Sequence, residues 1–386
     1  MGSEDMSAAP NTSAAENAPA VENMPTVANK TAENSVPAWH YLHGEPSVQG
    51  RLKAAPEYFK VREDLGFTPC GEGEHILLYI RKRGQNTQWI ARELARVAGV
   101  TQREVTWAGL KDRHAVTEQW FGVHLPGKAE PNFSSLENAD VQILARARHN
   151  KKLKIGALKG NWFELVISDL VLNEASDRSA LEARLTAIAR RGVPNYYGEQ
   201  RFGHHFGNIV QARAMFNGRK VKDRNKRSLY LSAARSYLFN LAASARLSAG
   251  LGEQLLNGDC LMLAGTQSFF TINDDNPLDH NLQARFADED VRLSAPLWGR
   301  GRLPSLDAAA ELELAALTAQ ADLCQGLENQ GLKQERRALL LKPQDMSWQQ
   351  QGDRLQLSFW LPAGSYATSV VRELVKDSEG HEDISE

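Results

Sequence analysis

The chain has 386 residues, of which 42% are hydrophobic and 24% are charged, as is usual for a globular protein with two or three domains. No apolar run approaches the ~20 residues that cross a bilayer, and the first residues show no secretory or transit pattern, so we expect no membrane contact. Three distant cysteines, Cys70, Cys260 and Cys324, make neither a disulfide framework nor a zinc signature, and we therefore expect a cytoplasmic protein.

The formal net charge of −2 is unevenly distributed. Residues 1–38 carry −4 and residues 377–386 carry −5, which leaves +7 on residues 39–376. Residues 1–38 lack periodicity and are rich in small and polar residues, so we expect a disordered acidic tail at that end and a second acidic tail at 377–386. A basic body predicts a polyanionic partner, although a solvated basic surface is the alternative.

Residues 39–188 alternate between strand and helix patterns. Helices are predicted at 87–98, ending at Gly99, and at 177–191, ending at Gly192. Strands are predicted at 59–63, 76–80, 104–109, 117–125, 141–147 and 161–168.

The pattern changes after Gly192. A loop rich in glycine, proline and aromatic residues covers 192–203, and long Ala- and Leu-rich helical stretches follow at 228–250 and 307–324. Strand patterns return at 336–342 and 354–360, and a helix at 365–376 closes the fold. The simplest architecture is an α/β (α+β) domain with a mixed sheet, in two parts (39–188 and 336–376), interrupted by a more helical insertion at 189–335.

The segment 104–121 presents a charged triplet between two predicted strands. Asp112 lies between Lys111 and Arg113, just after Gly109. A lone carboxylate beside cations stays ionised at neutral pH, as a nucleophile or a general base must. The alternative is a solvated turn aspartate.

Two basic stretches suit nucleic acid. Between Val141 and Phe163 there are six cations and no acid, and between Arg219 and Arg227 there are six cations and one acid. Cations meet phosphates while nearby rings stack on bases, although two solvated loops are the alternative. The candidate RNA contacts are Arg146, Lys151, Lys152, Lys154, Arg201, Arg219 and Lys220.

Other chemistries lack their motifs in this sequence. It contains no zinc-deaminase signature, no Walker loop, no dinucleotide-binding glycine pattern and no Gly-x-Ser-x-Gly. The adjacent His204 and His205 have no further ligand at a useful spacing. We therefore expect that an enzyme built on this chain works without a metal or a cofactor.

Four motifs together resemble one known family. They are Ala108–Thr117 (AGLKDRHAVT), Gly160–Phe163 (GNWF), Pro194–Gly203 (PNYYGEQRFG) and Leu361–Thr368 (LPAGSYAT) followed by Arg372-Glu373-Leu374. In this order over residues 40–376 they resemble the tRNA pseudouridine synthase D (TruD) family. The resemblance implies a pseudouridine-synthase catalytic domain set in a V against the insertion. It also implies isomerisation of a tRNA uridine, typically at position 13, without a metal or nucleotide cofactor, and we expect a monomer.

The resemblance also implies roles for five residues. Asp112 takes the place of the catalytic aspartate and Lys53 that of a basic residue beside it. Phe59, Asn161 and Phe163 take the places that contact the target base, where the two rings could sandwich it. Whether Asp112 attacks the sugar or the base, or removes a ribose proton, stays open.

Each of these residues has a structural alternative. Phe163 alternates with Leu165 and Ile167 as a core strand residue would, Asn161 could form a turn, and Lys53 could lie on the surface. Glu199 and Arg201 could order the junction between domains. A non-catalytic RNA-binding or RNA-remodelling protein on the same scaffold, or a protein-binding scaffold, is the alternative function.

Overall fold

The computed structural model describes residues 37–172 and 174–377. The predicted acidic tails, 1–38 and 377–386, lie outside the described residues except for residues 37, 38 and 377. Two further expectations stay predictions, namely the boundaries of the insertion at 189–335 and its V-shaped arrangement.

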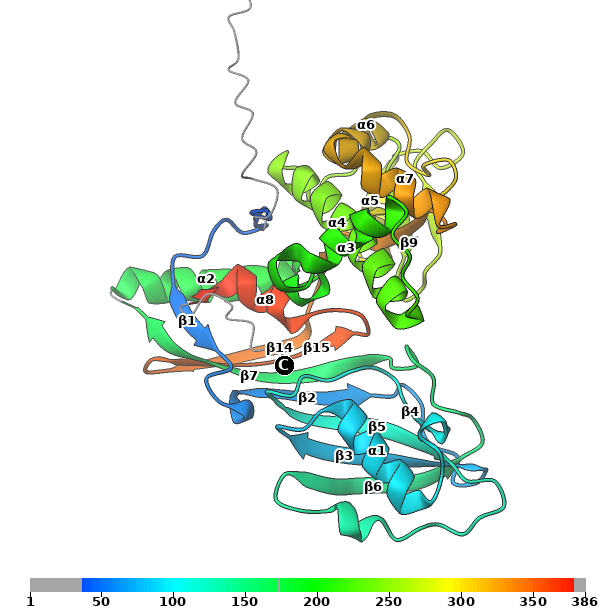
Figure 1. Ribbon diagram of the computed structural model, residues 1–386. Helices are drawn as coiled ribbons and strands as arrows, with labels where there is room; N and C mark the ends of the chain where they lie inside the picture. The colour runs from blue at the N-terminus through cyan, green and yellow to red at the C-terminus, as the bar shows by residue number, and fades with distance from the viewer. Residues whose placement is uncertain (1–36, 173, 378–386) are drawn as a thin grey trace, which may run out of the picture. The chain divides into compact units, whose positions relative to one another are not determined.

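A large mixed sheet forms the frame of the chain's first and last parts (Figure 1). Its main path runs in the order β14-β15-β7-β2-β5-β3-β6, with β1, β4 and β16 paired at its margins. Its strands are β1 Gln49–Leu52, β2 Phe59–Asp64, β3 His75–Arg83, β4 Val105–Trp107, β5 Val116–His124, β6 Val141–His149, β7 Gly160–Val171, β14 Gln344–Gln351, β15 Arg354–Pro362 and β16 Lys376–Asp377. The pairs β2–β5 and β1–β16 are parallel, and the other pairs are antiparallel, so the predicted mixed sheet is confirmed.

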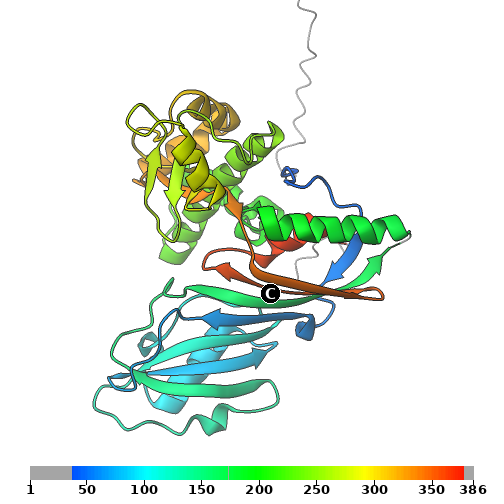
Figure 2. The same cartoon turned by 180° about the vertical axis from the view of Figure 1, so that it is seen from behind.

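Three helices cover this sheet. Helix α1 (Thr87–Ala98) packs Ile90 and Leu94 against β3, β5 and β6, and the view from behind shows these strands in front of it (Figure 2). Its predicted end at Gly99 is confirmed, because Gly99 has a φ of 60° and closes the helix in the left-handed region. Helices α2 (Ala175–Arg191) and α8 (Ala367–Leu374) bury their apolar faces against β7 and β15.

The residues between 193 and 341 build a second layer around their own core. Their helices are α3 Gly207–Phe216, α4 Arg224–Ser248, α5 His280–Ala287, α6 Asp307–Leu317 and α7 Ala321–Asn329. A four-stranded sheet in the order β10-β9-β11-β12 packs with them, from β9 Cys260–Leu263, β10 Phe269–Thr271, β11 Val291–Leu297 and β12 Glu335–Ala338. The chain enters and leaves this layer side by side, because β8 (Val193–Pro194) pairs with β13 (Leu340–Leu341).

One expectation about the second layer is corrected, and several elements were not predicted. The helix predicted over 307–324 is two helices, α6 and α7, separated by a tighter turn at Thr318–Gln320. The strand β12 overlaps the strand pattern predicted at 336–342, but β9, β10, β11, α3 and α5 were not predicted, since these strands have three to seven residues and the helices have ten and eight. The edge strand β14 of the large sheet was also not predicted, because Met346 and Trp348 are the two apolar residues in a strand that is otherwise polar.

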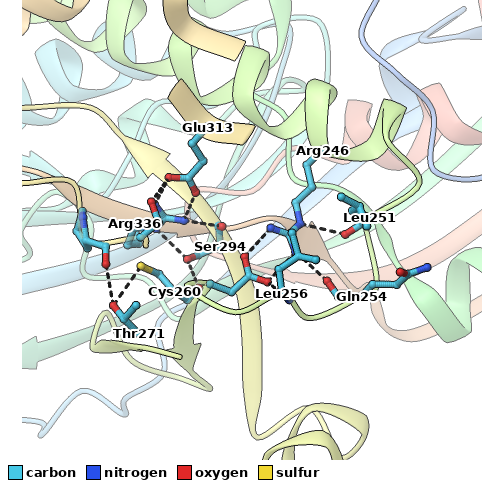
Figure 3. Close-up of polar contacts among 12 residues, drawn as sticks. Arg246, Leu251, Gln254, Leu256, Cys260, Thr271, Ser294, Glu313 and Arg336 are labelled. Atoms are coloured by element: carbon cyan, nitrogen blue, oxygen red, sulfur yellow. Dashed lines mark hydrogen bonds and ion pairs between the residues drawn. The ribbon is translucent and has the colours of Figure 1, made fainter. Parts of the chain in front are cut away.

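Two buried ion pairs hold this small sheet to its helices (Figure 3). Arg336 on β12 donates to both oxygens of Glu313 on α6, with Nη2–Oε1 at 2.6 Å, and its guanidinium also reaches Ser294. The two side chains are 0% and 7% exposed. Arg246 on α4 makes a matching two-pronged pair with Asp259. Such pairs offset the cost of burying charge only while both partners are present.

We therefore predict that Arg336→Met lowers the free energy of unfolding by about 3–5 kcal/mol, because it leaves the Glu313 carboxylate buried and unpaired. The double variant Arg336→Met/Glu313→Leu should recover most of that loss. Urea unfolding followed by far-UV circular dichroism measures both.

The matched control is Arg285→Met, which breaks the pair with Asp290 whose side chains are 38% and 55% exposed. It should cost less than about 1 kcal/mol. Equal losses in the buried and the exposed variant would contradict the prediction.

Candidate active site

A cavity of about 300 Å³ opens at the centre of the large sheet, over residues 59–61 of β2, residues 161–163 of β7 and the loop from β4 to β5. Its lining includes all five residues to which the family resemblance gave a site role, namely Lys53, Phe59, Asp112, Asn161 and Phe163. These residues come from four separate segments of the chain, and the fold brings them together.

Asp112 presents its carboxylate to this cavity from the loop between β4 and β5. Its Oδ1 accepts a hydrogen bond from the backbone N–H of His114 at 2.9 Å, and its Oδ2 forms an ion pair with the Lys53 ammonium. The side chains of Lys53 and Asp112 are 23% and 26% exposed, so a small ligand can still reach them.

The electrostatic balance keeps Asp112 ionised. Burial acts to raise the pKa of the carboxyl, but the Lys53 ammonium and the His114 N–H outweigh it, and the pKa lies below its ordinary value. The carboxylate is thus charged at neutral pH, as the charged triplet predicted. The cation that does this is the distant Lys53, while the adjacent Arg113 directs its Nε to the Gly84 carbonyl.

The backbone of Lys53 is strained. It follows β1 with a φ of 61°, in the left-handed region that residues other than glycine rarely adopt. Such a conformation costs about 1–3 kcal/mol and is concentrated at functional sites. The Lys53 ammonium also lies 4.6 Å from the centre of the Phe59 ring, a cation–π contact.

Phe59 and Phe163 contact each other edge to face, with ring centres 6.3 Å apart and planes at 79°. Phe163 also stacks on Phe359 of β15 at 5.6 Å, so it is a core strand residue and a wall of the cavity at once. The edge-to-face contact leaves no slot for a planar ligand between Phe59 and Phe163. A base could be sandwiched by them only if one ring turned.

Asn161 contributes an unused acceptor to the site. Its Oδ1 is buried and has no hydrogen-bond partner among the described residues. A buried carbonyl without a partner costs about 1–3 kcal/mol. A ligand N–H would offset this cost once the amide turned its oxygen into the cavity that Asn161 lines. The neighbouring Gly160 has a spatial reason to be glycine, since a Cβ there would lie 2.2 Å from the Trp360 ring and 2.4 Å from the Leu361 carbonyl oxygen.

The opposite wall of the cavity comes from residues 198–200 and 365–368. Arg201 fixes these two segments to each other by donating to the Tyr366 hydroxyl at 2.8 Å and to Ser232 Oγ at 3.0 Å. Arg337 stacks on Tyr197 at 4.2 Å and donates to the Gly364 carbonyl. No pattern in the sequence indicated the role of Arg337. For Arg201 the sequence left open whether the side chain orders the junction between domains or contacts RNA, and the RNA contact stays a prediction.

The other candidate RNA contacts lie on the surface. Lys151, Lys152 and Lys154 are exposed and line a second cavity, where the rings of Phe67 and His149 stack at 5.0 Å. Arg146 pairs with Glu130, Arg219 donates to Gln211, and Lys220 is exposed. Their contact with RNA stays a prediction, and Phe67 is an aromatic candidate that the sequence reasoning overlooked.

Lys111 does not face solvent. It belongs to the charged triplet around Asp112, but its ammonium is bound to Glu63 of β2 at 2.5 Å. The two side chains are 9% and 0% exposed, so a phosphate contact is ruled out in this structure. Glu63 has a signal in the sequence, because it continues the inward-facing alternation of Phe59 and Val61 and is thus a carboxylate at a core position.

Within residues 37–172 and 174–377, no cluster of three histidine, cysteine or acidic side chains is placed to hold a metal ion. None of the helices described is long and apolar enough to cross a bilayer.

Comparison with known proteins identifies the family. Residues 36–210 and 210–374 match the family model described as tRNA pseudouridine synthase D (TruD). The chain belongs to this family. A tRNA pseudouridine synthase D of Aeromonas hydrophila is 60% identical over 339 residues, covering 88% of this chain and 94% of that protein. One of Shewanella oneidensis is 48% identical over 336 residues, covering 87% and 88%.

A solved structure has the same fold. It is the crystal structure of a Methanosarcina mazei protein described as a tRNA pseudouridine synthase D, with a TM-score of 0.68 at 19% identity. The match covers 87% of this chain and 95% of that one. The TruD resemblance and the fold class expected from the sequence are confirmed.

We predict that Gly160→Ala lowers the free energy of unfolding by about 1–3 kcal/mol, because the added methyl group overlaps Trp360 and the β15 backbone. Gly207→Ala is the control, since its Cβ meets nothing within 4 Å and its φ is ordinary. Thermal unfolding of both variants measures the difference. An unchanged melting temperature in Gly160→Ala would contradict the close approach of β7 and β15.

Proposed function

We propose that this protein is a tRNA pseudouridine synthase that isomerises a uridine of tRNA, with Asp112 as the catalytic carboxylate. One observation carries the proposal: an ionised Asp112, paired with Lys53, lines the same cavity as Phe59, Asn161 and Phe163, in a chain of the TruD family.

The reaction suits such a site. Pseudouridine formation breaks the bond between ribose C1′ and uracil N1, turns the base, and forms a bond from C1′ to C5. The C5 proton is lost and N1 gains a proton, so nothing is oxidised and no cofactor is required. One carboxylate can start this by attacking the sugar or the base, or by removing a ribose proton, and these three routes stay open.

Asn161 supplies a basis for choosing uracil. Uracil has an N–H at its N3 position, whereas cytosine carries only an acceptor there. The buried Asn161 Oδ1 could accept a hydrogen bond from the N3–H of uracil, whereas in cytosine it would face a second acceptor. To enter the cavity the uridine must leave its stack, which costs a few kcal/mol and is offset by contact with Phe59 and Phe163.

Three finer expectations belong to the same proposal. The uridine is position 13 of tRNA, the enzyme works as a monomer without a nucleotide cofactor, and it works in the cytoplasm. The ordered family motifs support the position, and a tRNA substrate supports the compartment. Pseudouridine mapping in total tRNA with and without the protein tests the position, and light scattering on the purified enzyme tests the monomer.

We predict that Asp112→Asn reduces pseudouridine formation at least about a thousandfold, because the amide keeps the shape but loses the charge and the reactivity. Binding of tRNA should stay within several-fold. Release of tritium from tRNA labelled at uridine C5 measures the chemistry, and filter binding measures the affinity.

Asp288→Asn, at an exposed carboxylate at the end of α5, serves as the control and should leave both quantities unchanged. Full turnover by Asp112→Asn would refute the catalytic assignment. Binding without turnover in the wild-type protein would favour the alternative, a non-catalytic RNA-binding protein on the same scaffold.

We also propose that the exposed lysines beside Phe67 and His149 bind tRNA phosphates. Among the described residues, no acidic side chain lines that second cavity, and the two stacked rings offer a face to a base. The slope of log K against the log of the salt concentration measures how many phosphates are contacted. Each lost phosphate contact reduces the size of this slope by about 0.9 for a double-stranded nucleic acid and by about 0.7 for a single strand.

Lys151→Gln/Lys152→Gln should therefore weaken tRNA binding and reduce that slope by between one and two. Lys342→Gln is the control, because its ammonium is already paired with Glu289. Affinity measured at several salt concentrations decides the question, and an unchanged slope in the double variant would remove these lysines from the interface.

A further inference from the structure

A layer of buried polar side chains lies beneath the Asp112 loop, and the mechanism above does not use it. Lys82 on β3 is its largest member and is 0% exposed. Its ammonium donates to the Gln85 carbonyl at 2.7 Å and makes a longer contact, 3.4 Å, with the backbone carbonyl of Asp112 itself. No carboxylate among the described residues lies within ion-pair distance of it.

The same loop is held at two further points. Gln119 on β5 donates through Nε2 to the Gly109 carbonyl at 2.6 Å, and Thr87 at the start of α1 accepts from the Lys111 N–H at 3.2 Å. Thr87 and Gln119 are hydrogen-bonded to each other at 3.0 Å. The backbone of residues 109–112 therefore rests on side chains from β3, β5 and α1, and Lys82 is the charged one among those three.

Stability alone does not account for a lysine at this position. A buried ammonium without a carboxylate partner costs far more than a neutral side chain of similar size. Burial lowers the pKa of Lys82 to about 8; repulsion from Lys111 adds to the effect, and attraction by Asp112 and Glu63 opposes it. Its cross-strand neighbours, Thr117 and Val141, carry no charge. Lys82 is thus charged at neutral pH and loses its charge as the pH rises through about 8.

We propose that Lys82 is a positioning residue for Asp112: it fixes the backbone of the loop that carries the carboxylate and places a positive charge beneath the cavity. The proposal rests on the function proposed above. Because Asp112 stabilises the charged form of Lys82, the charge of Lys82 stabilises the carboxylate of Asp112 by the same amount. A fixed cation also stabilises the negative charge that develops as the glycosidic bond breaks.

The first test needs no variant. The kcat of the wild-type enzyme should fall on the alkaline side with an apparent pKa near 8, because deprotonation of Lys82 removes the charge. Lys82→Met and Lys82→Gln should both lower kcat tenfold or more at pH 7, with KM for tRNA within about twofold. Their residual activity should no longer show the alkaline fall.

Lys82→Gln keeps a hydrogen-bond donor without the charge, so it separates the effect of the charge from that of the hydrogen bonds to the loop. It also keeps the test informative if Lys82→Met does not fold. Thr117→Val is the matched control, since Thr117 is buried beside Lys82 on β5 and its hydroxyl has no partner among the described residues. It should leave kcat and the alkaline fall as in the wild type.

The inference would be overturned if Lys82→Gln kept the wild-type kcat, or if its kcat still fell at alkaline pH. In either case the proposed function would stand, provided that the wild-type enzyme is active and Asp112→Asn is inactive. A wild type that makes no pseudouridine would refute the proposed function instead. A Lys82→Gln variant that melts earlier but retains kcat and the alkaline fall would show a purely structural role.

Discussion

The ion pair between Asp112 and Lys53 is the contact around which the site is organised. A carboxylate in a half-buried cavity would take up a proton if burial acted alone, and the Lys53 ammonium prevents this. The pair joins two segments that are 59 residues apart in the sequence. They precede the neighbouring parallel strands β2 and β5, so the pair forms only once these two strands have come together. Folding and charge state are therefore linked at one contact.

The surrounding site is built from surfaces that the rest of the fold needs anyway. Phe163 stacks on Phe359 in the core and at the same time lines the cavity, and Asn161 lies two residues before it on β7. The far wall depends on Arg201 and Arg337, whose guanidinium groups fix the loops around Tyr366 and Tyr197. Neither arginine is among the residues that line the cavity, so a change in either one acts on the cavity through these loops.

Local patterns in the sequence were enough to predict most of the large sheet and its helices. The alternation in β2, β5 and β7 and the cap at Gly99 depend on neighbours along the chain. Such patterns could not predict contacts across the fold, namely that Lys111 turns inward to Glu63 and that Lys82 lies beneath the Asp112 loop. They also did not reveal the turn that divides the helix predicted over 307–324. The family resemblance supplied Lys53, which no spacing rule connects to Asp112.

Two requirements at position 53 favour different residues, because Lys53 combines a left-handed backbone with an ion pair to Asp112. The conformation favours glycine, whereas the ion pair requires a long cationic side chain. Selection for stability alone would therefore drift towards glycine or asparagine at this position, and each step in that direction would release the Asp112 carboxylate from its counter-charge. Under the function proposed above, stability and activity therefore favour different residues at this position.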